Sequence, residues 1–290
     1  MPETVDTVVF KAADGGGNPC PVTLFADGLT PEHMQEMSRA SGQEASFVMS
    51  PDAPDCDFRV RYFLPLHELS MCMHATIGTS VVLVEKGLAR RSPFYFQSER
   101  GRVRVDWERD SDGTVNVLVE QFAPEFSEEV PPVGTISGVL GISEDEIAPL
   151  PIVNASTSRF KLLVPLASRA VLDGLSPKWE SMWNMCDSCN STGVYAFAIE
   201  DGEIYARQFP NRGGYNEDPA TGVAASALGA YFVNYGILPV ADGWNSIQVK
   251  QGFAMGRPSV IRADTRVENG RITSVRVGGT AEIVKAGESA

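Results

Sequence analysis

The sequence has few of the residues that hold metals or form disulfides, and several common signatures are missing. It contains only five cysteines and three histidines among 290 residues. Five is an odd number, and the chain starts without the basic and apolar regions of a signal peptide, so we expect reduced thiols and a cytoplasmic location. No apolar run approaches the roughly 20 residues that a membrane-spanning helix needs.

Cofactor signatures are also missing. The glycine-rich loop at 14–19 matches neither the dinucleotide-binding pattern nor a P-loop, which would end in Gly-Lys-Ser/Thr. The lone Cys186-x-x-Cys189 pair has no second pair nearby, and we interpret it as two thiols in a helix–loop segment rather than as a zinc site. We therefore predict that no metal, nucleotide or flavin is required. The net charge of −13 argues against nucleic acid and anionic membrane surfaces as partners.

What the sequence does contain is an internal repeat with an offset of 145 residues. Under this offset Ala75 and Thr76 correspond to Ala220 and Thr221. Each copy follows a strand-like run that ends in proline, and each precedes a run rich in Ala, Val and Leu. The pattern predicts a strand, a loop and the start of a buried helix in both copies, with the helices at about 74–86 and 219–234.

The repeat and the many short strand candidates around it predict the fold. We expect an α/β protein of α+β character, with two pseudo-symmetric halves that are each a curled, mostly antiparallel sheet around a central helix. The proline-rich, acidic segment 122–134 marks the boundary between them. The halves are then 1–122 and 123–279, and the last strand, at about 280–290, is a candidate to return to the first half.

Several residues near the repeat are candidates for chemistry. His74, at the predicted helix start, is either a first-turn residue hydrogen-bonded locally or a site residue. Asp218 before Pro219 is typical of an ordinary N-cap followed by proline at the first helical position. Gly222 weakens the predicted first turn, which indicates close approach of the backbone to a ligand. Two helix N-termini facing one cleft would bind a substrate carboxylate through backbone N–H groups.

Glu44 is a further candidate. It ends a polar turn and directly precedes a strand predicted at 45–50. Most acids in such a place are simply solvated. A carboxylate at the edge of a cleft can instead act as a general base if partial burial raises its pKa toward neutrality.

Taken together, these segments resemble the PhzF family of phenazine-biosynthesis-like isomerases, which have the diaminopimelate epimerase fold. The landmarks extend over nearly the whole chain: 17–20, Glu44 to Val48, Arg61 to Phe63, Cys72 to Thr76, Glu217 to Gly222, Gln251-Gly252 and Met255 to Ser259. The resemblance implies a homodimeric enzyme without a cofactor, which moves a proton on a small carboxylate-bearing substrate.

The resemblance also implies roles for individual residues. Glu44 stands where the family has a glutamate that removes a proton from one carbon and returns it to another. His74 and Asp218 match the other polar catalytic residues. Gly222 matches a glycine whose backbone helps to hold the substrate.

Four further residues are expected to contact the substrate: Cys72, Met73, Ala75 and Val223. Met73 replaces a glycine that is usual in the family, and Val223 replaces a serine of the phenazine-type members. Because these changes add a side chain and remove a hydroxyl, we expect a less polar substrate than those members accept. Cys72 lies near a catalytic cysteine of the related racemases, but its repeat partner is Glu217, which breaks the thiol pair of a two-thiol racemase.

Three functions are open at this stage. The first is a proton-moving isomerase, and because several relatives serve antibiotic or other secondary-metabolite pathways, we expect a similar setting. The second is an amino-acid racemase or epimerase of the same fold. The third is a non-catalytic protein that binds a small carboxylate tightly without turnover. The joint presence of Glu44, His74 and Asp218 argues against the third.

Overall fold

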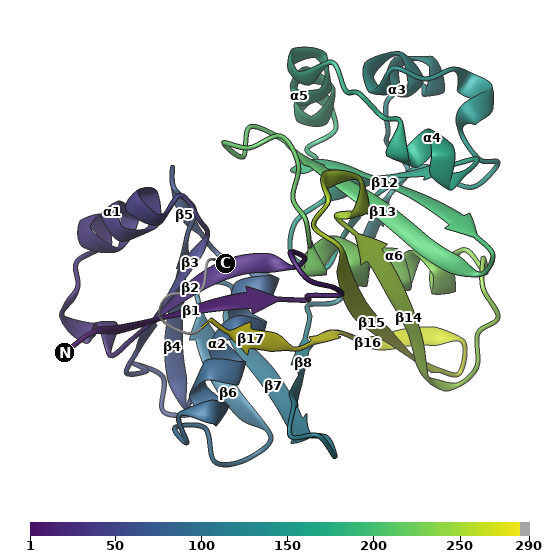
Figure 1. Ribbon diagram of the computed structural model, residues 1–290. Helices are drawn as coiled ribbons and strands as arrows, with labels where there is room; N and C mark the ends of the chain where they lie inside the picture. Colours follow the sequence, from purple (N-terminus) through teal and green to yellow (C-terminus); the bar gives the residue numbers. More distant parts are fainter. Residues whose placement is uncertain (285–290) are drawn as a thin grey trace. The chain divides into compact units, whose positions relative to one another are not determined.

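The computed structural model describes residues 1–284, and the chain divides into two compact units (Figure 1). Unit 1 comprises Met1–Glu120 together with the end of the described chain from Val277, and unit 2 comprises Gln121–Arg276. Residues 285–290 of the predicted last strand lie outside the described residues. None of the described helices is long and apolar enough to cross a membrane.

Unit 1 is built mostly from strands around one long helix. Its elements are β1 (Glu3–Val9), β2 (Asn18–Leu24), a 3₁₀ helix (Ala26–Gly28), α1 (Pro31–Ser41), β3 (Ala45–Met49), β4 (Phe58–Phe63), β5 (Glu68–Leu69), α2 (Met73–Glu85), β6 (Phe94–Ser98), β7 (Gly101–Arg109), β8 (Val115–Glu120) and β17 (Ala281–Ile283). β17 pairs antiparallel with β1, so the end of the described chain belongs to the sheet of unit 1.

Unit 2 has a similar composition of elements. They are β9 (Glu125–Ser127), α3 (Val133–Leu140), a 3₁₀ helix (Glu144–Glu146), β10 (Val153–Ser156), β11 (Lys161–Leu166), α4 (Arg169–Asp173), α5 (Trp179–Ser188), β12 (Gly193–Glu200), β13 (Glu203–Pro210), α6 (Gly222–Asn234), β14 (Gly243–Gln251), a 3₁₀ helix (Phe253–Met255), β15 (Ser259–Glu268) and β16 (Arg271–Gly279). β16 runs across the boundary, because its residues from Val277 onward belong to unit 1. β9 lies inside the predicted boundary segment 122–134 and pairs with β10, so that segment is not a bare linker.

The two units repeat one pattern of strand pairing, which confirms the predicted pseudo-symmetry of the fold. In unit 1, β1–β2, β3–β4 and β6–β7 pair antiparallel, whereas β2–β3 and β4–β6 pair parallel. In unit 2, β10–β11, β12–β13 and β14–β15 pair antiparallel, whereas β11–β12 and β13–β14 pair parallel. In both units the second parallel pair is joined through the long helix, α2 or α6. Parallel neighbours need such a crossover.

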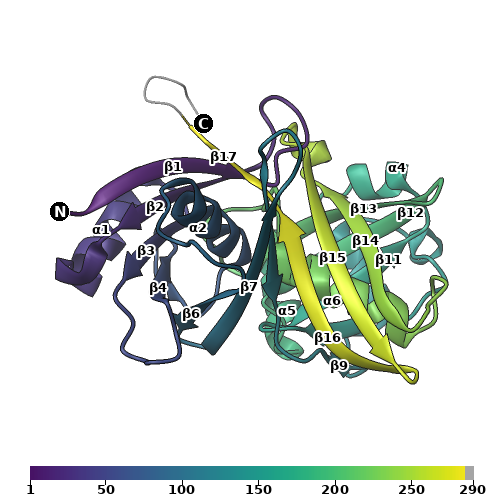
Figure 2. The same ribbon diagram turned by 90° about the horizontal axis from the view of Figure 1, so that it is seen from below.

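The long helices lie at the centre of each unit because neither helix has a face of charged side chains. All residues of α2 from Met73 to Val84 are buried, and α2 contacts β1, β2, β3, β8 and β17 of its own unit (Figure 2). α6 is buried from Gly222 to Phe232 and contacts β10, β11, β14 and β15. A helix without a polar face is stable in water only when other elements cover it.

One predicted helix start is wrong. α6 begins at Gly222, not at Pro219, and its N-cap is Thr221 rather than Asp218. The backbone N–H of Asp218 donates instead to the carbonyl of Gln208, which holds this segment against β13. Gly222 is therefore the first residue of the helix and does not interrupt it.

The packing of α2 against β1 can be tested at Gly78. A Cβ atom on Gly78 would lie 2.9 Å from Thr7 Oγ1 and 3.1 Å from Val9 Cγ2. We expect Gly78→Ala to lower the free energy of unfolding by about 1–3 kcal/mol through overpacking, although alanine favours a helix over glycine by about 1 kcal/mol. Urea denaturation measures this change.

Gly138 in α3 provides a matched control, because a Cβ atom there would have no heavy atom within 4 Å. Gly138→Ala should be neutral or stabilising by up to about 1 kcal/mol. If the Gly78→Ala protein is as stable as the Gly138→Ala protein, β1 moves to make room for the added methyl group and the predicted overpacking is wrong.

Candidate functional site

Three of the predicted site residues form one cluster in unit 1. Glu44 directly precedes β3, Cys72 is the N-cap of α2, and His74 lies in the first turn of α2. The Cys72 thiol donates a hydrogen bond to Glu44 Oε2 at 2.9 Å. His74 Nδ1 lies 3.4 Å from the Cys72 sulfur, and His74 Nε2 lies 3.7 Å from Glu44 Oε2. The cluster thus brings a carboxylate, a thiol and an imidazole within reach of one another.

The cluster is shielded from water but open on its carboxylate side. The His74 side chain is 4% exposed and the Glu44 side chain is 15% exposed, while Cys72 is buried. Burial, and after it the negative charge of Glu44, raises the pKa of Cys72 well above its ordinary value. The thiol is therefore a proton donor to the carboxylate at neutral pH and not a thiolate.

Hydroxyl groups fix the start of α2 against the neighbouring strands. The Tyr62 hydroxyl on β4 and Thr76 Oγ1 are 2.6 Å apart, and Ser46 Oγ on β3 and Thr79 Oγ1 are also 2.6 Å apart. Thr76 Oγ1 in addition donates to the carbonyl of Cys72. The sequence alone does not single out these supporting residues. Their local signal is the pair of threonines three positions apart in a helix that is mostly apolar.

The remaining predicted catalytic residue, Asp218, lies in a buried polar network of unit 2. Its side chain is buried and accepts a hydrogen bond of 2.5 Å from Thr221 Oγ1 and one of 3.4 Å from the backbone N–H of Ala220. Burial, and next the charge of Asp218, raises the pKa of Tyr195 well above its ordinary value. Asp218 thus holds Ala220 and Thr221, the last two residues before α6.

Gln251 holds this segment in place. Its side-chain amide donates to the Asp218 carbonyl at 2.7 Å and to Thr221 Oγ1 at 3.0 Å, and its carbonyl oxygen accepts from the Thr221 N–H at 3.1 Å. Gly252 follows in the left-handed region, with φ +80°, where a Cβ atom would collide with the carbonyl oxygens of Arg257 and Pro219. The Gln251-Gly252 landmark of the sequence is explained by this close contact.

Gln208 is a further residue that the sequence alone does not single out. It lies on β13 opposite Asp218 and is 1% exposed, and both polar atoms of its side chain have no hydrogen-bond partner among the described residues. Buried amides without partners are rare in proteins. A polar residue between Arg207 and Phe209, in a strand that leads into the repeat, is the only signal for it in the sequence.

Glu217, the repeat partner of Cys72, has a structural role. Its two carboxylate oxygens accept hydrogen bonds from Arg207 Nε and Nη2 at 2.9 and 2.7 Å, and both side chains are 11% exposed. Two parallel hydrogen bonds of this kind fix both partners. In the structure the N-cap of α6, which corresponds to Cys72 before α2, is Thr221. Neither Glu217 nor Thr221 supplies the second thiol of a two-thiol racemase.

The predicted substrate-contacting residues lie at the starts of the two long helices. Met73 and Ala75 belong to the first turn of α2, and Gly222 and Val223 are the first two residues of α6; all four are buried. In unit 1 the structure therefore brings Glu44 together with the residues at the start of α2. In unit 2 it places Asp218 next to the start of α6. No side-chain cap hydrogen bond forms at the N-terminus of either helix.

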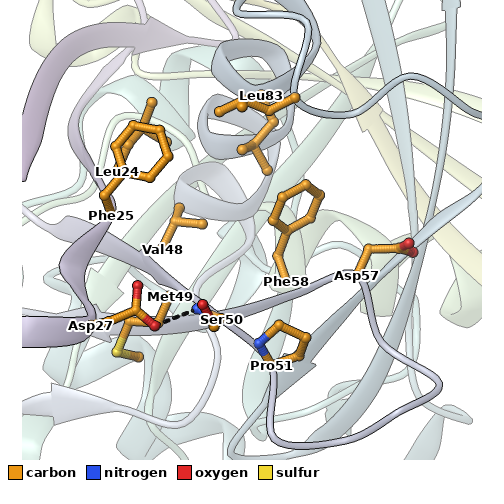
Figure 3. Close-up of a pocket in the computed structure, with 11 residues that line it drawn as sticks. Leu24, Phe25, Asp27, Val48, Met49, Ser50, Pro51, Asp57, Phe58 and Leu83 are labelled. Atoms are coloured by element: carbon orange, nitrogen blue, oxygen red, sulfur yellow. Dashed lines mark hydrogen bonds between the residues drawn. The ribbon is translucent and has the colours of Figure 1, made fainter.

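A separate cavity of about 190 Å³ lies in unit 1 (Figure 3). Its walls include Val48, Met49 and Phe58, and Asp27 at its edge accepts a hydrogen bond from the Ser50 N–H. Its lining is mostly apolar, and none of the predicted site residues contributes to it. Because Glu44 precedes β3 and Met49 ends it, this cavity lies toward the far end of that strand, and we do not assign the chemistry to it.

Comparisons with known proteins agree with this architecture. The family model described as phenazine biosynthesis-like protein, PhzC-PhzF, matches residues 7–287. The "Uncharacterized isomerase YddE" of Escherichia coli K12 is 32% identical, over 98% of this chain and 96% of its own. The crystal structure of a Bacillus anthracis phenazine biosynthesis protein of the PhzF family has a TM-score of 0.88 at 27% identity, and the match covers 97% of this chain and 96% of that one.

A more distant neighbour shows how widely the fold is used. A probable proline racemase from Agrobacterium radiobacter K84 has a TM-score of 0.70 at 12% identity, over all of this chain and 93% of its own, and shares the fold alone. The family match covers almost the whole sequence and includes both units. The chain therefore belongs to the phenazine biosynthesis-like PhzC-PhzF family, as its sequence landmarks predict.

Proposed function

We propose that this protein is an isomerase that moves a proton on a small carboxylate-bearing substrate without a cofactor, and that Glu44 is the base. The observation that carries the proposal is the hydrogen-bonded cluster of Glu44, Cys72 and His74 at the start of α2. Relatives such as the Escherichia coli protein are named isomerases, which agrees with this reaction class.

The geometry suggests how the proton moves. Glu44 is open enough to meet a small molecule and removes a proton from a substrate carbon, with the electrons of the C–H bond passing into the substrate. The Cys72 hydrogen bond holds the carboxylate in one orientation, and His74 Nε2, 3.7 Å away, can exchange a proton with it. Glu44 then returns the proton to a different carbon, so the enzyme ends in its starting state.

The start of α2 supports this chemistry electrostatically. Backbone N–H groups at a helix N-terminus favour negative charge, and they are most effective where water is excluded. Negative charge that develops on the substrate as Glu44 takes the proton would be stabilised beside Met73 and Ala75. The roles that the family resemblance implies for Asp218 and Gly222 in holding the substrate are part of the proposal.

A racemase with two thiols is less well supported. Such an enzyme needs a cysteine at each of two positions, and neither Thr221, the N-cap of α6, nor Glu217, which the sequence offset pairs with Cys72, is a cysteine. That carboxylate is paired with Arg207 through two hydrogen bonds. One-base proton transfer through Glu44 therefore fits the residues better.

Solvent isotope exchange tests the role of Glu44. Wild-type protein incubated in deuterated water with a panel of small amino acids and unsaturated carboxylates should add deuterium at carbon to at least one of them. Glu44→Gln preserves the side-chain shape but removes the base, so we expect incorporation to slow by about 10²- to 10⁴-fold while binding is kept.

Glu36→Gln is the matched control, because Glu36 is an exposed residue of α1. Mass spectrometry and carbon-bound deuterium signals in NMR report the exchange. If the Glu44→Gln protein exchanged at the wild-type rate, Glu44 would not be the base.

Substrate selectivity is tested at Met73 and Val223. Both side chains are buried at helix starts, and both differ from the residue that phenazine-type members have. We expect Met73→Gly combined with Val223→Ser to shift the ratio of kcat/KM toward more polar panel members by about 10-fold or more, since one methylene group in a pocket changes this ratio by about 10- to 200-fold.

Thermal melting of the double variant and of each single variant serves as the control for folding. A selectivity profile that does not change in a folded double variant would show that these two residues do not determine which substrate is accepted.

A further inference from the structure

We infer that Glu44, Cys72 and His74 also form a binding site for a zinc-type divalent cation, and that the cation switches the active site off. The inhibition by the cation rests on the proposed function, whereas the binding of the cation does not. Among the residues that the structure describes, these three are the one group of three or more metal-binding side chains whose ligand atoms all lie within 4.8 Å of one another.

The separations of the three ligand atoms resemble the edges of a zinc tetrahedron. Typical zinc bond lengths give edges of about 3.5 Å for S···O and S···N, and about 3.3 Å for N···O. The cluster has 2.9 Å between Cys72 Sγ and Glu44 Oε2, 4.0 Å between Cys72 Sγ and His74 Nε2, and 3.7 Å between His74 Nε2 and Glu44 Oε2. Each separation is thus within about 0.6 Å of the value that zinc requires.

The ligand types select the class of cation. A thiolate and an imidazole favour zinc, and Co²⁺ as its spectroscopic substitute, over magnesium and calcium, which prefer oxygen ligands alone. Three protein ligands leave a fourth position for water, which is the arrangement of accessible rather than closed zinc sites. The partly exposed carboxylate of Glu44 provides the side from which the cation enters.

When the cation binds, the S–H bond of Cys72 is replaced by a bond between sulfur and the cation. The S–H bond of Cys72 breaks, the sulfur keeps the electron pair and bonds to the cation, and the proton leaves to the solvent. Glu44 Oε2 stops accepting the thiol hydrogen bond and donates a lone pair to the cation. A carboxylate that shares its negative charge with a cation is a much weaker base, so the metal-bound protein is expected to be inactive in the proposed reaction.

The pair Cys186 and Cys189 is the main alternative site at which a metal could bind to thiolates. Cys186 is buried in α5, and the Cys189 thiol contacts the carbonyl oxygens of Met185 and Cys186. The pair has no third ligand that completes a compact group among the described residues. Cys189→Ser therefore serves as the matched control, since it removes a thiol without altering the cluster in unit 1.

The test is a titration of the full chain, first stripped of metal with a chelator, with Zn²⁺ and separately with Co²⁺. Calorimetry should give one zinc per chain, and Co²⁺ should produce the near-ultraviolet thiolate charge-transfer band and the strong visible bands of a four-coordinate ion. Cys72→Ser should abolish the charge-transfer band and weaken zinc binding by more than about 100-fold, because even the loss of outer-shell partners costs 10- to 100-fold. Glu44→Gln should weaken zinc binding as well.

The Cys189→Ser protein should bind zinc like the wild type. The inference is overturned if the wild type binds no zinc in large excess, or if the charge-transfer band survives Cys72→Ser and is lost in Cys189→Ser. Circular dichroism of each variant establishes that it is folded. If zinc binds at the cluster but leaves deuterium exchange by the wild type unchanged, the inference that the cation inhibits the enzyme is wrong and the metal site is not affected. If the Glu44→Gln protein exchanges deuterium at the wild-type rate, the proposed function is wrong and the metal site is again not affected.

Discussion

The structure of unit 1 depends on the burial of α2, a helix without a charged face. Because every residue from Met73 to Val84 is buried, other elements must cover the helix on all sides, and β1, β2, β3, β8 and β17 do so. The same constraint places Cys72 and His74 beside Glu44, although 28 residues separate Cys72 from Glu44 along the chain. The hydroxyl pairs at Thr76 and Thr79 then fix the rotation of the helix. Chemistry at the cluster therefore follows from packing of the core.

The two units use one chain pattern for different polar chemistry. Both have the same sequence of parallel and antiparallel pairings around a long apolar helix. At the start of α2 this pattern holds a thiol, an imidazole and a carboxylate. Before α6 it holds the Asp218 carboxylate in a network with Thr221 and Gln251. The repeat thus fixes where a site can form, while the individual side chains decide what each copy does.

The sequence predicts the elements whose signals are local. The strand–loop–helix repeat, the start of α2 near His74 and the strand after Glu44 all appear in the structure, but α2 and α6 begin at Met73 and Gly222, 149 residues apart rather than 145. The predicted start of α6 is wrong because Gln251, 30 residues beyond Thr221, holds the Asp218 segment outside the helix. No local pattern shows such a contact. For the same reason the thiol hydrogen bond to Glu44 and the unpartnered amide of Gln208 could not be predicted from spacing.

The most direct test of the central claim is a crystal structure of the Glu44→Gln protein with a carboxylate that the wild type turns over. A base must lie next to the proton that it removes, so the reacting carbon is predicted to lie about 3–3.5 Å from the side-chain oxygen at position 44. A ligand bound only in the apolar cavity beside Phe58, or with no carbon near position 44, would contradict the assignment of this cluster as the site of proton transfer.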